Sequence, residues 1–369
     1  MNAVAPLANE FTQRAQAFAA IHSGSPTNAF VTNCDATVRF LPDNRSPPVT
    51  LVTDYRPGQA WVCSPCSAYG DYAIEELERF SRARVLRPLH WLCSGMNRWL
   101  RAAEFDRAAT INNWLLSTNL YPSMGAERLI EWRDASIAEH PDHAVWLRSL
   151  NGRYNASWLD AAVAAGFELI PSRQVYLIDD ARAAAARHHN ARVDLKLLAR
   201  THLTRSHTGF NSRDYERMAQ LYAMLYLDKY SRLNPQYTAA FLAAWHRAGL
   251  LALEAFRNDD GMICAIVGTF ALESTITAPI VGYDTRAPQS AALYRLLMAS
   301  VMESAMATRA RINFSAGAAK FKRLRGATAE LEYSAVYARH LSRRRQRAVS
   351  AVRSLAAHVG VPFMQKFEL

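Results

Sequence analysis

The spacing of apolar and polar residues predicts alternating strands and helices along nearly the whole chain. Apolar residues three and four positions apart indicate helices, and short apolar or alternating runs indicate strands. In the first half these patterns predict strands at 37–40, 49–53, 60–63, 109–117, 144–150 and 167–178, and helices at 72–80, 86–100, 125–139 and 156–165.

A polar, basic stretch at 179–211 follows, and we interpret it as the connection between two units. After it, the patterns predict helices at 212–228, 236–248, 288–307 and 318–324, and strands at 251–256, 262–272, 275–283, 311–315 and 330–341. The turn from Asn258 to Gly261 predicts a hairpin between the first two of these strands.

The repeated order of elements predicts three regions. An N-terminal domain is expected at 1–195, a C-terminal domain at 196–342, and a basic C-terminal tail helix at 343–369. We expect the apolar side of the tail helix to pack on the body of the protein, although its arginines also suit an anionic lipid surface or a nucleic acid.

Composition favours a folded, water-soluble protein. Half of the 369 residues are apolar and 20% are charged, which excludes intrinsic disorder for most of the chain. No apolar run approaches the roughly 18 residues that a membrane span needs. The first 25 residues lack the pattern of a signal peptide, so we expect a cytoplasmic location.

The net charge of +11 comes from the second half of the chain. Residues 1–195 hold 19 Lys and Arg against 20 Asp and Glu, whereas residues 196–369 hold 24 against 12. Such an excess favours an anionic partner: CoA phosphates, an acidic carrier protein, tRNA or anionic lipid. A solvated basic face combined with a codon bias towards arginine explains it equally well.

Four short segments of the second half carry a family resemblance. They are Tyr230-Ser-Arg-Leu-Asn-Pro-Gln-Tyr-Thr238, Gly282-Tyr-Asp284, Asn313-Phe-Ser-Ala-Gly317 and Phe321-Lys-Arg-Leu-Arg-Gly326. Together with the element order, they resemble the GNAT acyltransferase superfamily, in particular its FemAB-like, tandem-GNAT branch. The last segment is similar to the Phe-Lys-x-x-Phe-Gly signature of that branch, with Arg325 where an aromatic residue is usual.

The resemblance implies an α/β fold of tandem GNAT-like domains, each a mixed twisted sheet flanked by helices. It also implies amide-forming acyl or aminoacyl transfer. We expect the two halves to pack side by side, with a deep cleft near their junction.

Four residues are candidates for the catalytic chemistry. Lys322 can stabilise an oxyanion or hold an anionic donor, Tyr283 can protonate a leaving thiolate, Asp284 can accept the proton of the amine, and Ser315 can orient the acyl carbonyl. We expect Lys322 to be exposed and to face the same cleft as Tyr283 and Ser315. The alternative roles are a solvated helix charge for Lys322, packing for Tyr283 and a chain turn for Asp284.

The resemblance places the phosphates of the donor at the helix start that follows Asp284, where free amides point at an anion. Arg286, Gln289 and Ser290 are the candidate cofactor-binding residues there. The segment has no glycine after Gly282, and Pro288 removes one amide donor.

An acceptor cleft is expected along 230–238, with Tyr230, Asn234 and Tyr237 as candidate substrate-binding residues. Asn234, followed by Pro235, is explained equally well as a helix cap.

The five cysteines do not suggest a disulfide framework. Cys63 and Cys66, followed by His90 and Cys93, have a zinc-like spacing. Because Cys66, His90 and Cys93 lie among apolar helical residues, we favour buried thiols and predict no metal site.

These observations lead to one expected function and two alternatives. The first is an N-acyltransferase that moves an acyl group from a CoA or carrier-protein thioester to a small-molecule amine, with acyl-CoA as a co-substrate and no tightly bound cofactor. The second is an aminoacyl-tRNA-dependent, FemAB-like transferase. The third is a catalytically inactive tandem-GNAT module that only binds.

Overall fold

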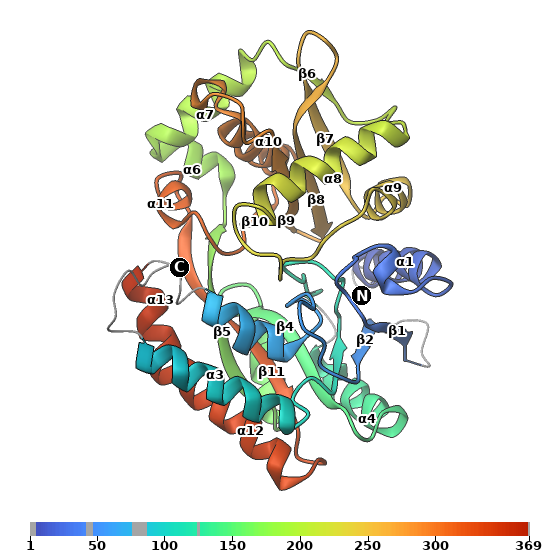
Figure 1. Cartoon of the computed structure of the whole chain (residues 1–369). Coiled ribbons are helices and arrows are strands. Elements are labelled where there is room, and N and C mark those ends of the chain that lie inside the picture. The colour runs from blue at the N-terminus through green and yellow to red at the C-terminus, as the bar shows by residue number, and fades with distance from the viewer. Residues whose placement is uncertain (1–4, 42–46, 76–86, 124–125, 368–369) are drawn as a thin grey trace.

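A single mixed sheet runs through the whole molecule (Figure 1). The computed structural model describes residues 5–41, 47–75, 87–123 and 126–367. In this part of the chain the strands follow the order β1-β2-β3-β4-β11-β5-β10-β9-β8-β7-β6. The predicted α/β class is therefore confirmed.

The first half contributes strands at one end of the sheet and helices on both of its faces. Its strands are β1 (Thr37–Phe40), β2 (Pro48–Val52), β3 (Ala108–Ile111), β4 (Ala144–Asn151) and β5 (Glu168–Ile178). Its helices are α1 (Ala5–His22), α3 (Arg87–Ala102), α4 (Leu129–Glu139) and α5 (Ala156–Ala164), with short turns η1 (Thr27–Ala29), η2 (Ser67–Asp71) and η4 (Ala126–Arg128).

The second half continues the sheet. Its strands are β6 (Thr204–Ser206), β7 (Ala252–Arg257), β8 (Ile263–Leu272), β9 (Thr275–Tyr283), β10 (Arg311–Asn313) and β11 (Thr328–Tyr337). Its helices are α6 (Ala181–Arg187), α7 (His189–Ala199), α8 (Ser212–Tyr226), α9 (Ala239–Arg247), α10 (Leu293–Thr308) and α11 (Ala319–Arg323), with the turn η5 (Gln289–Ala291). The chain continues through α12 (Arg343–Leu355), η6 (Ala356–Gly360) and α13 (Val361–Phe367).

Two features join the halves into one sheet. Strand β10 pairs antiparallel with β5, Ile312 opposite Ile178. Strand β11 lies between β4 and β5 and is antiparallel to both. The prediction that placed residues 330–341 in a C-terminal domain is therefore wrong for this strand. Its apolar residues Ala335 and Val336 are buried in the cores on either face of the first half, which explains why the strand crosses over.

Helices cover both faces of each half. Helices α8 and α9 pack with α1 over one face of the second half, and α6, α7 and α10 cover the other. In the first half, α4 and α5 lie on one face and α3 and α12 on the other. The tail helix packs as expected, with Ala348, Val349 and Val352 buried.

Several element boundaries differ from the sequence prediction. Residues 60–63 form a turn instead of a strand, and the strand expected at 109–117 ends at Ile111. The pattern also missed α1 and, within the supposed connection at 179–211, α6, α7 and β6. Of the helix expected at 72–80, residues 76–80 lie outside the described part of the chain.

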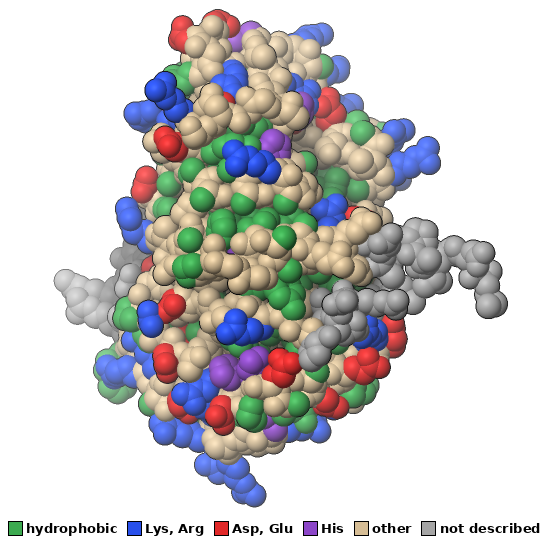
Figure 2. All heavy atoms as spheres, turned by 90° about the vertical axis from the view of Figure 1, so that its right-hand side faces the viewer, with side chains coloured by type: hydrophobic (Ala, Val, Ile, Leu, Met, Phe, Trp, Pro, Cys, Tyr) green, Lys and Arg blue, Asp and Glu red, His purple; other side chains and the backbone are tan. Residues whose placement is uncertain are grey.

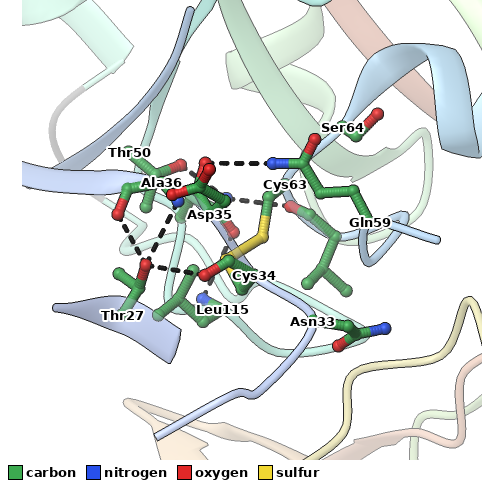
Figure 3. Close-up of a disulfide and its surroundings, with 12 residues drawn as sticks. Thr27, Asn33, Cys34, Asp35, Ala36, Thr50, Gln59, Cys63, Ser64 and Leu115 are labelled. Atoms are coloured by element: carbon green, nitrogen blue, oxygen red, sulfur yellow. Dashed lines mark hydrogen bonds between the residues drawn. A yellow bond between two sulfur atoms is a disulfide. The ribbon is translucent and has the colours of Figure 1, made fainter. Parts of the chain in front are cut away.

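A disulfide bond joins Cys34 to Cys63 (Figure 3). This finding corrects the expectation of unpaired cysteines, and it removes Cys63 from the zinc-like set. Around the bond, the side-chain amide of Gln59 donates to the carbonyl of Asp35. The disulfide therefore ties the segment before β1 to the loop at 59–66. Both cysteines of the bond are buried in the core.

Candidate functional site between the halves

A hollow of about 540 Å³ lies where loops of the two halves meet. Its walls are formed by Tyr55, Gly58, Asp71, Ile74 and Glu75 from the first half and by Arg232, Leu233 and Gln236 from the second. The cleft expected near the junction of the halves thus has a counterpart here. It borders the segment 230–238 that the sequence marked as an acceptor site.

Two of the three residues predicted to bind the acceptor hold the halves together. Asn234 accepts a hydrogen bond from the indole of Trp61 at 2.9 Å and donates to the carbonyl of Tyr226. The hydroxyl of Tyr237 donates to the carbonyl of Leu115 at 2.8 Å. Tyr230 is exposed. Asn234 does not cap a helix, because α9 begins at Ala239 behind the Thr238 cap.

Lys322 is buried, not exposed as we expected. Its ammonium group donates three hydrogen bonds to the carbonyls of Phe314, Ser315 and Ala316, at 2.7, 3.2 and 2.7 Å. These acceptors occupy all three N–H donors of the side chain. Burial, and then the nearby Arg173, lower the pKa of Lys322 to about 7. Lys322 therefore anchors the loop after β10, and it can act on a substrate only through its charge.

Strand β10 leaves its neighbour β9 after a short parallel pairing. Only Arg311, Ile312 and Asn313 pair with β9, and Asn313 lies opposite Thr277. The strands expected at 275–283 and 311–315 are thus parallel neighbours over three residues. Strand β9 continues to Tyr283, so its last six residues have no paired strand on the β10 side among the described residues.

The catalytic candidates are only partly brought together by this geometry. Lys322 contacts the carbonyl of Ser315, which has a backbone φ of 59° in the turn after β10. Tyr283 lies at the far end of β9, where its ring approaches Tyr294 with centroids 6.3 Å apart. Six residues of strand separate Tyr283 from the level of Asn313, or roughly 20 Å at the usual rise.

A group of charged side chains lies in the interior where β4, β5 and β11 meet. Arg173 makes an ion pair with Glu332, Nε to Oε1 2.7 Å, and Glu332 is only 2% exposed. Arg148 donates from one nitrogen to the carbonyl of Val62 and the side chain of Asn113. The guanidinium groups of Arg148 and Arg173 each lie 5.0 Å from the centre of the Trp61 ring.

Comparisons with known proteins bear on the fold. No protein-family model and no curated protein sequence matches the chain. Among solved structures, the C-terminal domain of a putative lysylphosphatidylglycerol synthetase from Agrobacterium fabrum superposes with a TM-score of 0.51 at 13% identity, covering 95% of this chain and 97% of that one. The chain has the tandem GNAT-like fold. FemX gives a TM-score of 0.49 at 9% identity, over 67% of this chain and 83% of its own. The lysylphosphatidylglycerol synthase of Bacillus licheniformis gives 0.42 at 12% identity, over 60% and 76%.

In this GNAT-like fold, the arginine of the loop predicted to hold donor phosphates is already paired with a carboxylate of the same loop. Arg286 binds Asp284 through two hydrogen bonds of 2.9 Å, and Arg217 binds the same carboxylate at 3.0 Å. The hydrogen bonds from Arg286, followed by those from Arg217, hold the pKa of Asp284 well below its usual range. Asp284 is therefore poorly suited to accept the proton of an amine.

The same loop differs from the expected helix start. Gln289 and Ser290 are exposed in the turn η5, and α10 begins only at Leu293, after Ala292 in the left-handed conformation. The predicted helix start at Pro288 is therefore wrong. The amides at the start of α10 follow Ala292 instead.

Sequence reasoning missed Trp61, Arg148 and Glu332 and used Arg173 only as part of a pattern. The available signal was a charged residue inside an apolar strand: Arg148 within 144–150 and Arg173 within 167–178. Because buried strands rarely tolerate an unpaired charge, such positions point to an internal polar site.

The surface gives less support to a basic docking face. On the face shown in Figure 2, basic and acidic side chains are interspersed around apolar ones. Among the described helices of this GNAT-like chain, none is long and apolar enough to span a membrane.

Proposed function

We propose that this protein transfers an acyl or aminoacyl group to an amine acceptor. The observation that carries the proposal is the early parting of β10 from β9. It leaves residues 278–283 of β9 without a paired strand on the β10 side among the described residues, and the loop that Lys322 anchors follows β10 directly. In the GNAT-like resemblance, this opening receives the activated donor.

The proposed reaction is nucleophilic acyl transfer. The neutral amine attacks the carbonyl carbon of the thioester or ester, negative charge develops on the carbonyl oxygen, and the leaving sulfur or oxygen takes up a proton. The charge of Lys322 stabilises the oxyanion without donating a hydrogen bond, and Ser315 orients the carbonyl. Tyr283 is the proton donor if the leaving group reaches the far end of β9.

A tRNA-bound aminoacyl donor is the second candidate. It is favoured by the neutralised loop at 284–286, which offers a CoA pyrophosphate no free arginine. The similar domain over the full chain length comes from a putative lysylphosphatidylglycerol synthetase, so an acceptor on a lipid headgroup belongs to this candidate.

Mass spectrometry of ligands that copurify with the full chain separates these functions. A CoA or pantetheine species supports the thioester donor, and bound RNA supports the tRNA donor. Transfer is then measured with labelled acetyl-CoA and with charged tRNA, each offered a mixture of amines. If neither donor loses its label in the presence of protein, the transferase proposal is wrong. The catalytically inactive binding module is then the remaining function.

A further inference from the structure

The interior group at Trp61 carries more positive than negative charge. It contains Arg148, Arg173 and Lys322, whereas Glu332 is the one carboxylate that forms an ion pair with any of them in the described part of the chain. Glu332 also attracts Arg148, but one carboxylate does not offset three cations. The group therefore keeps an excess of positive charge in a region where an uncompensated charge is costly.

Arg148 is the cation of this group whose hydrogen-bond donors are not all used by the described residues. Burial and the nearby Arg173 lower the pKa of Arg148 to about 10, so its guanidinium is largely removed from bulk water. The residue is nevertheless only half-buried, which means that part of its surface remains accessible. One of its nitrogens bonds Val62 and Asn113, and the other two make no hydrogen bond with the described residues.

Trp61 links the hollow between the halves to this group. Its wall residue Leu233 accepts a hydrogen bond from the backbone of Trp61 at 3.1 Å. The Trp61 ring lies 6.2 Å from Tyr72, which follows the wall residue Asp71. Trp61 thus bonds a wall residue of the hollow through its backbone and contacts the two guanidinium groups through its ring.

We propose that Arg148, supported by the charges of Arg173 and Lys322, binds a phosphate group of the substrate between the two halves. An excess of positive charge suits a phosphate, which carries up to two negative charges, better than a carboxylate. The planar fork of an arginine also matches phosphate oxygens. The assignment depends on the proposed function only because it calls the phosphate ligand a substrate. Binding of phosphate at Arg148 does not itself require acyl transfer.

This site differs from the one expected after β9. Arg286 is exposed and already paired with Asp284, so it gains little by binding an anion. An anion at Arg148 instead restores electroneutrality in a desolvated place, where charges interact strongly. The structure therefore puts the phosphate inside the junction, not at the start of α10.

The test is a titration of the full chain with sodium phosphate at constant ionic strength, followed by calorimetry and by the melting temperature. We expect wild-type protein to bind phosphate and Arg148→Gln to bind it at least about tenfold more weakly, as for the loss of a charge-assisted hydrogen bond. Arg353→Gln is the matched control: it removes an exposed arginine of α12 and should change affinity less than about twofold.

Three results would overturn the assignment: no binding by the wild-type protein, equal binding by Arg148→Gln, or acetate binding as tightly as phosphate. If Arg148→Gln does not fold, Arg148→Lys takes its place; losing the fork should still weaken binding several-fold, and unchanged affinity refutes the site.

Two further ligands identify the source of the phosphate. Coenzyme A tests a soluble phosphate ester, and phosphatidylglycerol vesicles test a lipid headgroup. A rise in melting temperature with either ligand that is lost in Arg148→Gln supports the site. If neither ligand raises the melting temperature, Arg148 does not form a substrate site. A protein that binds phosphate at Arg148 yet transfers no acyl group refutes the proposed function alone.

Discussion

Arginine lies beside a carboxylate at two places in this molecule, and the two places differ in their exposure to water. At the end of β9, Arg286 is 75% exposed and meets Asp284 in contact with water. In the interior, Arg173 meets Glu332, which is 2% exposed, and two more cations stand nearby. The first pair is screened and contributes little, whereas the second lies where removing either partner leaves a buried charge.

The two pairs contain the same types of charged group, so burial determines how strongly each pair acts on its surroundings. The loop at 284–286 has the residues expected of an anion site, but its charges satisfy each other. The interior group has an excess of positive charge that nothing in the described chain cancels. Variants at both places test this contrast.

The largest effect is expected from Glu332→Gln. It leaves Arg173 without its carboxylate beside Arg148, and breaking a buried ion pair in this way costs about 3–5 kcal/mol of unfolding free energy. Chemical denaturation measures the change. The double variant Arg173→Met with Glu332→Leu should recover most of it, because both charges are then removed. A loss below about 1 kcal/mol in the single variant would mean that the interior is well hydrated.

Lys322→Met should be the next most damaging change. Three loop carbonyls lose their donor, which costs about 2–3 kcal/mol, although the apolar stem is retained. An exposed lysine, which the sequence predicted here, would have had little effect on folding. Lys320→Met, on the exposed side of the same helix, is the control and should unfold like the wild type. Equal stability of the two variants would refute the anchoring role.

The buried ammonium group should also make stability depend on pH. The pKa of Lys322 is about 7 in the folded protein and near 10.5 in an unfolded chain, so between these values the unfolded state binds more protons. Stability from this group therefore rises from pH 7 towards pH 10 and is lowest below pH 7, where the desolvated charge is fully present. Melting temperatures of wild type and Lys322→Met, compared from pH 6 to pH 9.5, should diverge in favour of wild type as the pH rises. If the melting temperatures of the two proteins change in parallel with pH, the lowered pKa of Lys322 is contradicted.

Local patterns predicted most strands and helices, because apolar periodicity reflects burial directly. The sequence patterns failed where a strand or side chain has its partner in a distant part of the sequence. Strand β11 joins the first half, and Arg325 takes the usual aromatic position because it packs on Phe321 and binds the buried Asp194 of α7 at 2.6 Å. The catalytic roles of Tyr283, Asp284, Ser315 and Lys322 are still predictions. Their spacing in sequence did not reveal that Lys322 is saturated or that Asp284 is held by two arginines.

The smallest effect is expected from Arg286→Gln. The side chain is exposed and, within the described ranges, bonds Asp284 alone, which keeps Arg217 as a partner, so the melting temperature should stay within about 1 °C of wild type. The resemblance to GNAT proteins makes Arg286 a donor-phosphate ligand, and that role would raise the KM for acyl-CoA about tenfold or more at unchanged stability. The pairing with Asp284 argues instead for less than a twofold change, since the arginine must first give up its carboxylate. Steady-state kinetics of Arg286→Gln beside Arg148→Gln decides between them. A large KM effect for Arg286→Gln with none for Arg148→Gln would reverse the contrast between the two places and return the phosphate to the start of α10.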